Sequence, residues 1–223
     1  MVSAWQVILV VICGGTLFHT GLHALVHGAF NVHQAALAFF LVINVLVNFW
    51  ELALHACADQ IRREYEETKV PYKGRVTERV NEVMTKRIPL EEVFRFHHWT
   101  GIWSSYALFD PGYADRRAFG WNIDVGNGWS TVLPALLTVF GMTFAIIPAR
   151  ALGIIGIAMY WQMLYGTIVY FFQFFNNRCH VGYSKAMIAS FVGSSNGLWF
   201  IFPIWGLWIS TVLIYADSYA ILR

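Results

Sequence analysis

The first 50 residues of the sequence contain no Asp, Glu, Lys or Arg, and later stretches at 125–149, 151–177 and 186–216 are equally free of charge. Only 13% of all residues are charged, whereas soluble domains carry about 25%. Each charge-free stretch is longer than the roughly 20 residues that cross a bilayer. The composition therefore excludes an ordinary soluble domain and indicates an integral, multi-pass membrane protein.

Several sequence motifs are also missing. The three cysteines are an odd number and indicate no disulfide framework. The sequence has no Gly-rich phosphate loop, no CxxC pair and no GxSxG nucleophile elbow. A net charge of +2 gives no indication of nucleic-acid binding, and we expect none. The chemistry must therefore be sought in the apolar segments.

The apolar pattern predicts an all-α fold, a single membrane domain over residues 1–223. This domain is expected to be a bundle of five transmembrane helices, at about residues 4–29, 34–57, 125–147, 151–175 and 188–215. Residues 58–96 form a charged loop with 17 charged side chains, and its apolar spacing predicts one or two amphipathic helices. The aromatic segment 97–109 is expected to lie at the membrane interface.

The basic residues predict how the bundle is oriented. With five spans, the N-terminus and the loops 58–122 and 176–187 share one side, which carries 13 Lys and Arg residues. The other side carries Arg150 and Arg223. The positive-inside rule then places the charged loop in the cytosol.

A polar stripe crosses the predicted second span. Asn44, Asn48, Glu51 and His55 follow spacings of 4, 3 and 4, which places them within an arc of about 60° on a helix. Charge within a bilayer is costly, so this stripe must face protein or a cavity. A carboxyl group in apolar surroundings favours its neutral form and can act as a general acid. We predict Glu51 and His55 as catalytic residues and Asn48 as a substrate-binding residue; pairing within the stripe is the structural alternative.

Other spans offer partners for this acid. Asp124 begins the third predicted span and is a second catalytic candidate, with a helix-terminal role as its alternative. Asp217 ends the fifth span, where we expect a helix terminus. Asn196 and Trp199 lie one turn apart on that span, and an aromatic face stabilises a cation by about 0.5–2 kcal/mol. We predict Asn196, Trp199 and Tyr165 as substrate-binding residues.

The histidines raise the question of a metal. His19, His23 and His27 repeat every four residues, and His97 and His98 are adjacent. Imidazoles hold iron in some membrane oxygenases, but repeated HxxHH clusters are missing here. The three His on the first span also drift by about 80° around the helix. We therefore expect a histidine face that packs against another span, and we predict no metal and no cofactor.

Three stretches of the C-terminal half share their order and spacing with a known family. They are W-x-x-Y-x-x-x-D-x-x-Y from Trp103 to Tyr113, followed by Asp124; L-Y-G-x-x-x-Y from Leu164 to Tyr170, followed by His180; and N-G-x-W-x-x-x-P from Asn196 to Pro203. In these motifs the chain resembles the emopamil-binding protein family, the sterol Δ8–Δ7 isomerases, and the wider EXPERA superfamily.

The resemblance implies an isomerase that shifts a double bond in a sterol or sterol-like polycyclic terpenoid. In that family a membrane-embedded acid protonates the double bond, an aromatic face stabilises the cation, and a proton leaves a neighbouring carbon. Glu51 matches the acid, and Asp124 stands where the family has Glu. Asn196 and Trp199 match the polar and cation-stabilising pair.

The chain also departs from the family pattern. The family has a His one turn before its acid, where this sequence has Val47 and Asn48, and His55 follows one turn later. A second register would align His23 and His27 with the family's His and Glu, which would lose the carboxyl group. The charged loop is also longer than the family's connection.

Three other functions stay open at this point. A membrane terpene cyclase would give Asp217 a role as second acid. A non-catalytic lipid-binding protein, similar to the sigma-2 receptor branch, would use Glu51 and Asp124 to clamp its ligand. A His-dependent metal oxygenase is the third. The expected partners are a hydrophobic small-molecule substrate and membrane lipids, and a homodimer stays open. The resemblance implies the endoplasmic reticulum for a eukaryotic source and the inner membrane for a bacterial one.

Overall fold

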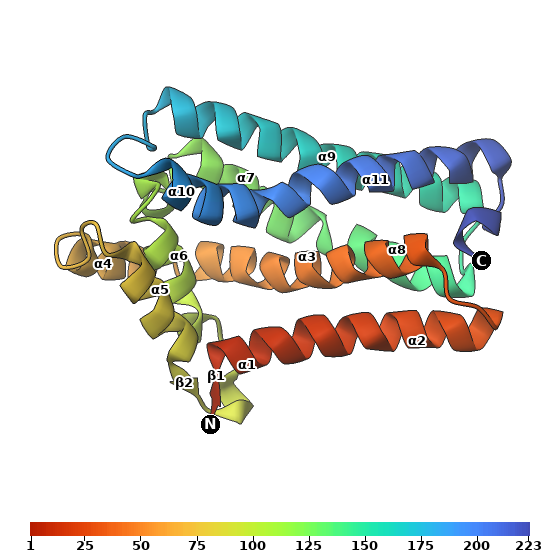
Figure 1. The fold of residues 1–223 in the computed structure, drawn as a ribbon, viewed down its shortest axis with the longest axis horizontal. Coiled ribbons are helices and arrows are strands. Elements are labelled where there is room, and N and C mark those ends of the chain that lie inside the picture. The colour runs from red at the N-terminus through yellow and green to blue at the C-terminus, as the bar shows by residue number, and fades with distance from the viewer.

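The computed structural model describes the backbone of residues 1–223 and all side chains except those at positions 191, 194 and 195. The long helices lie side by side in one bundle (Figure 1). In chain order the helices are α1 (Ala4–Leu9), α2 (Gly15–His27), α3 (Val32–Ala56), α4 (Ala58–Thr68), α5 (Val76–Thr85), α6 (Thr100–Tyr106), α7 (Phe119–Ser130), α8 (Val132–Phe144), α9 (Ala149–Asn176), α10 (Lys185–Ile188) and α11 (Ser194–Ala216). One π-helical turn, Val10–Gly14, joins α1 to α2, and another, Ala189–Gly193, joins α10 to α11.

Within the residues that the structure describes, four helical segments are long and apolar enough to cross a membrane. They are Ala4–His27, Val32–Ala56, Ala149–Asn176 and Asn196–Ala216. These segments overlap four of the five predicted spans. The chain is therefore an all-α, multi-pass membrane protein, as the charge-free stretches predicted.

The third predicted span, residues 125–147, is not one continuous helix. The structure divides it into α7 and α8, which meet at Thr131. Pro134 has no backbone N–H to donate to the carbonyl of Ser130, so the helical ladder is interrupted at this point. The apolar part, α8, has 13 residues and is shorter than a full span.

Helix α3 is central to the bundle and packs against α2, α7 and α8. Helices α9 and α11 pack closely along their length. A Cβ atom on Gly153 of α9 would lie 2.6 Å from the carbonyl oxygen of Ser210 on α11, so only glycine permits this approach. Small residues commonly allow such backbone contact between membrane helices. Helix α2 instead exposes Leu17 and Leu25, which suits contact with lipid.

The histidine face of α2 packs against α8, as expected. His27 Nε2 lies 2.8 Å from the carbonyl oxygen of Thr143, and His23 Nδ1 lies 3.3 Å from its hydroxyl oxygen. The His19 ring meets the Phe140 ring edge-on, with 5.0 Å between centroids. These three side chains serve packing between helices.

The charged connection gathers at one end of the bundle. Helices α4, α5 and α6 lie there together with the N-terminus and α10, while the C-terminus lies at the opposite end (Figure 1). A two-residue antiparallel pair, β1 (Val2–Ser3) with β2 (Arg87–Ile88), ties the N-terminus to this connection. The sequence did not predict this pair.

Candidate functional site

A cavity of about 160 Å³ lies where α3, α6, α7, α9 and α11 meet. Its wall combines two carboxyl groups, polar side chains and a large share of aromatic rings. The lining residues are Val47, Trp50, Glu51, Ile102, Trp103, Ile123, Asp124, Asn127, Gly166, Thr167, Tyr170, Asn196 and Trp199. Among the described side chains of this wall there is no Lys or Arg.

Four of the site residues predicted from the sequence line this one cavity. Glu51 comes from α3, Asp124 from α7, and Asn196 and Trp199 from α11. Asp124 is five residues inside α7, which begins at Phe119, so the helix-terminal alternative for this residue was wrong. Residues more than 140 positions apart in sequence therefore share one site.

Glu51 is held by a chain of hydrogen bonds. With the Asn48 amide oriented so that both of its atoms are satisfied, Asn48 Nδ2 donates to Glu51 Oε2 at 2.9 Å. Asn48 Oδ1 accepts from Asn44 Nδ2 at 3.1 Å, and Asn44 Oδ1 accepts from Trp199 Nε1 at 3.0 Å. Asn44, Asn48 and Glu51 are all buried. The polar stripe of α3 thus links the acid to the aromatic wall, and Asn48 positions Glu51 from behind the cavity lining.

Gly128 allows α7 to reach this acid. A Cβ atom at position 128 would lie 2.8 Å from Glu51 Cβ and 3.3 Å from the Asn48 carbonyl oxygen. Any side chain here would push α7 away from α3. The close approach brings the helix that carries Asp124 against the helix that carries Glu51.

Tyr113 and Tyr170 lie close to Asp124. The Tyr113 hydroxyl donates a hydrogen bond to the Asp124 carboxyl group. Burial, and next the nearby Asp124, raise the pKa of Tyr113, so this hydroxyl keeps its proton to donate. The Tyr106 and Tyr170 hydroxyl oxygens lie 2.8 Å apart, and Asn196 Nδ2 donates to Tyr106 at 3.2 Å. The second acid therefore has a fixed partner, and its surroundings are polar as well as aromatic.

Three predicted site residues do not line the cavity. Asn48, predicted to bind substrate, lies behind Glu51, and His55 and Tyr165 lie elsewhere. His55 is exposed one turn beyond Glu51, and its Nδ1 accepts a hydrogen bond from Trp129 Nε1 at 3.1 Å. Because one helical turn rises about 5.4 Å, His55 lies beyond the cavity, towards the C-terminal end of α3. Tyr165 is 53% exposed and stacks on Trp161. The face of α9 that meets the cavity carries Gly166, Thr167 and Tyr170 instead.

Three aromatic side chains of the segment 97–109 are buried in the protein. Trp99, Trp103 and Phe109 are each less than 10% exposed, so they pack into the bundle and do not form a headgroup belt. Trp103 Nε1 donates to the carbonyl oxygen of Trp50 at 2.6 Å, and its ring stacks on Tyr113. Because the Trp103 indole N–H already has a hydrogen-bond partner inside the protein, it does not need the polar membrane interface.

Sequence reasoning missed several residues of the cavity wall and its support. They are Trp50, Trp103, Tyr106, Tyr113, Asn127, Thr167 and Tyr170. A signal existed for four of them, because Trp103, Tyr106, Tyr113 and Tyr170 stand in the motifs that carry the family resemblance. Asn127 and Thr167 gave no such signal, because single polar residues at helical spacing are common.

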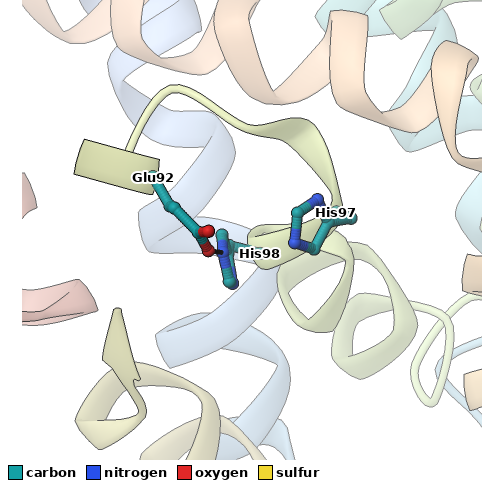
Figure 2. Close-up of side chains that lie close together, drawn as sticks. All are labelled: Glu92, His97 and His98. Atoms are coloured by element: carbon teal, nitrogen blue, oxygen red, sulfur yellow. Dashed lines mark hydrogen bonds and ion pairs between the residues drawn. The ribbon is translucent and has the colours of Figure 1, made fainter. Parts of the chain in front are cut away.

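Within the part of the chain that the structure describes, one group of His and acidic side chains lies close enough together to hold a metal ion. It consists of Glu92, His97 and His98 (Figure 2). None of the three lines the central cavity.

No family model, curated protein or solved structure matches this chain. The fold and the cavity define a multi-pass helical membrane protein with two carboxyl groups at one site.

Proposed function

We propose that this protein is an intramembrane acid–base isomerase, which shifts a double bond in a sterol or sterol-like polycyclic terpenoid. The observation that carries the proposal is the meeting of Glu51 and Asp124 in one aromatic cavity without a described Lys or Arg. Burial without a counter-charge favours the neutral form of a carboxyl group, which is the form that donates a proton. The family resemblance of the C-terminal motifs supports the same reaction.

The proposed reaction has two proton transfers. Glu51, positioned by Asn48, donates its proton to one carbon of the double bond, and a tertiary carbocation forms at the other carbon. The Trp199 ring faces this cation across the cavity and stabilises it. Asp124, held by Tyr113, accepts a proton from a neighbouring carbon, and the double bond forms one position away. One proton enters and one leaves, so no redox cofactor is needed.

The cavity volume bears on how the substrate binds. Ligand cavities for drug-sized molecules measure about 300–1,000 Å³, which is larger than the 160 Å³ found here. We propose that the reacting ring enters the cavity and that the rest of the substrate lies among the helices and lipid. This arrangement keeps water out of the cavity, so water cannot react with the carbocation.

We further propose that α7 and α8 together make a third membrane crossing, which gives five spans in all. The end of the bundle with the charged connection then faces the cytosol under the positive-inside rule. The membrane would be the endoplasmic reticulum in a eukaryote and the inner membrane in a bacterium.

The rival functions have less support from the geometry. The cyclase alternative needed Asp217 as second acid, but Asp217 forms an exposed ion pair with Arg150, with 3.2 Å between Oδ2 and Nη2. The oxygenase alternative needed a metal at the reaction site, and the Glu92 cluster does not line the cavity. A binding protein would use the same two acids, so only turnover separates it from an isomerase.

The test is product analysis with membranes that contain the protein and a panel of Δ8 sterols and related terpenoids. We expect a product of unchanged mass and ring count. Glu51→Gln and Asp124→Asn should each lower turnover by about 10²–10⁴-fold, the usual contribution of a general acid or base. Asp217→Asn is the matched control, because it also removes a carboxylate but lies in an exposed ion pair; it should stay within about twofold of the unmodified protein.

Each other outcome is informative. A product with an additional ring would favour a cyclase. Saturable sterol binding without any product would favour a binding protein. Full turnover in Glu51→Gln would refute the role of this acid.

A further inference from the structure

We propose that Glu92, His97 and His98 form a binding site for a divalent transition-metal ion, with zinc as the best fit. The site lies apart from the cavity and does not depend on the proposed function. Glu92 ends the 3₁₀ turn Leu90–Glu92, and His97 and His98 belong to the next turn, Phe96–His98. Figure 2 shows the Glu92 and His98 side chains meeting, with the His97 ring beside them.

The distances support a three-ligand set. Glu92 Oε2 lies 2.6 Å from His98 Nε2, and the His97 and His98 ring centroids are 4.0 Å apart. One ligand atom from each residue falls within a mutual distance of 4.8 Å. Ligands about 2.0–2.2 Å from a tetrahedral zinc lie roughly 3.3–3.6 Å apart. Changes of side-chain rotamer that move the ligand atoms by about 1 Å would therefore bring all three to zinc-binding distance.

The exposure of the residues allows an ion to enter. His97 is exposed, while Glu92 and His98 are half-buried. Water can therefore reach the site and supply a fourth ligand. Two imidazoles and one carboxylate suit zinc and similar transition metals, whereas magnesium and calcium prefer sites built from oxygen alone.

The surroundings indicate a bracing role. The two turns enclose residues 93–95, and Trp99 Nε1 donates to the Val93 carbonyl oxygen at 2.8 Å. Trp99 packs with Ala4 of α1 and with Trp50 of α3, which lines the cavity. A metal ion would lock the two turns together and hold this segment against the first two long helices.

Zinc titration of the purified protein tests the proposal. The protein is prepared metal-free in detergent micelles without a polyhistidine tag, and binding of zinc chloride is followed by calorimetry. We expect one saturable site. His97→Ala and Glu92→Gln should each weaken zinc binding at least tenfold, whereas His55→Ala, which removes another exposed histidine, should leave it unchanged. Magnesium at the same concentration should give no saturable binding.

Limited proteolysis supplies a second measurement. Trypsin can cut after Arg95, which is exposed between the ligands, and after Lys73, an exposed residue on the same connection. Zinc should slow cleavage after Arg95 at least fivefold but not cleavage after Lys73, and His97→Ala should abolish the protection.

Two results would overturn the inference. One is the absence of a saturable zinc site, or zinc affinity in His97→Ala and Glu92→Gln equal to that of the unmodified protein. The other is zinc binding with no protection of Arg95, which would refute the bracing role. Sterol turnover is not a readout here, so this proposal and the proposed isomerase can fail separately.

Discussion

Replacing Gly128 with alanine tests the contact between α7 and α3 directly. The new Cβ atom would lie 2.8 Å from Glu51 Cβ, whereas packed carbon atoms usually lie about 3.5–4.0 Å apart. Helix α7 must therefore withdraw by about 1 Å. Gly126, two residues earlier on the same helix, is the matched control, because a Cβ there would meet no atom within 4 Å.

The expected magnitude follows from two opposing effects. Glycine-to-alanine replacement inside a helix gains about 0.5–1 kcal/mol from lower chain entropy. Overpacking at a closed contact costs about 1–3 kcal/mol. The entropy gain is common to both variants and cancels in the comparison. Gly128→Ala should therefore be about 1–3 kcal/mol less stable than Gly126→Ala.

Thermal unfolding in one detergent measures this difference. For a chain of this size, 1 kcal/mol corresponds to about 2–4 °C, so the melting temperature of Gly128→Ala should lie roughly 2–12 °C below that of Gly126→Ala. If the proposed reaction is present, a displacement of about 1 Å should also lower turnover by about 10²-fold. Equal melting temperatures for the two variants would show that α7 does not approach Glu51 as described.

Three further predictions concern buried polar groups. Asn48→Ala removes the donor to Glu51, so it should destabilise the protein by about 1–3 kcal/mol in thermal unfolding; an unchanged melting temperature would contradict this bond. Burial raises the pKa of Asp110 above its unfolded-state value of 3.8. Protonated Asp110 therefore contributes its full share to the free energy of unfolding below pH 3.8, and this share is lost as pH rises through the folded-state pKa. Asp110→Asn should therefore raise the melting temperature at pH 8 but not near pH 4, and the same gain at both pH values would refute this. Burial, and next Asp110, raise the pKa of Cys179 to about 11, so iodoacetamide should label it at pH 8 roughly 100-fold more slowly than an ordinary cysteine of pKa about 8.5. Asp110→Asn should speed this labelling, and mass spectrometry of the peptide measures both rates.

The membrane class and four of the spans were predictable from the sequence alone. A bilayer contains no water to bond backbone groups, so long charge-free runs must form helices, and this requirement is visible in local composition. The stripe of Asn44, Asn48 and Glu51 was also predictable, because it depends only on the period of one helix. These parts of the fold and site rest on short-range patterns.

The rest of the site was decided by tertiary packing. The sequence placed Trp103 at the interface, but the structure turns it inward because its N–H finds the Trp50 carbonyl on another helix. The sequence favoured His55 because it shares a helix face with Glu51, yet the cavity ends before His55. Local periodicity says which residues share a face but not how far along the helix a neighbouring helix makes contact.

The contacts between distant segments had no local signature. Gly128 lets α7 approach Glu51 closely, and Glu92 meets the adjacent His97 and His98 because two short turns fold against each other. The sequence by itself therefore determined the membrane class and the acid on α3. The tertiary structure determined the partners of that acid and the cluster of Glu92, His97 and His98, because both depend on close approach between segments that no local pattern specifies.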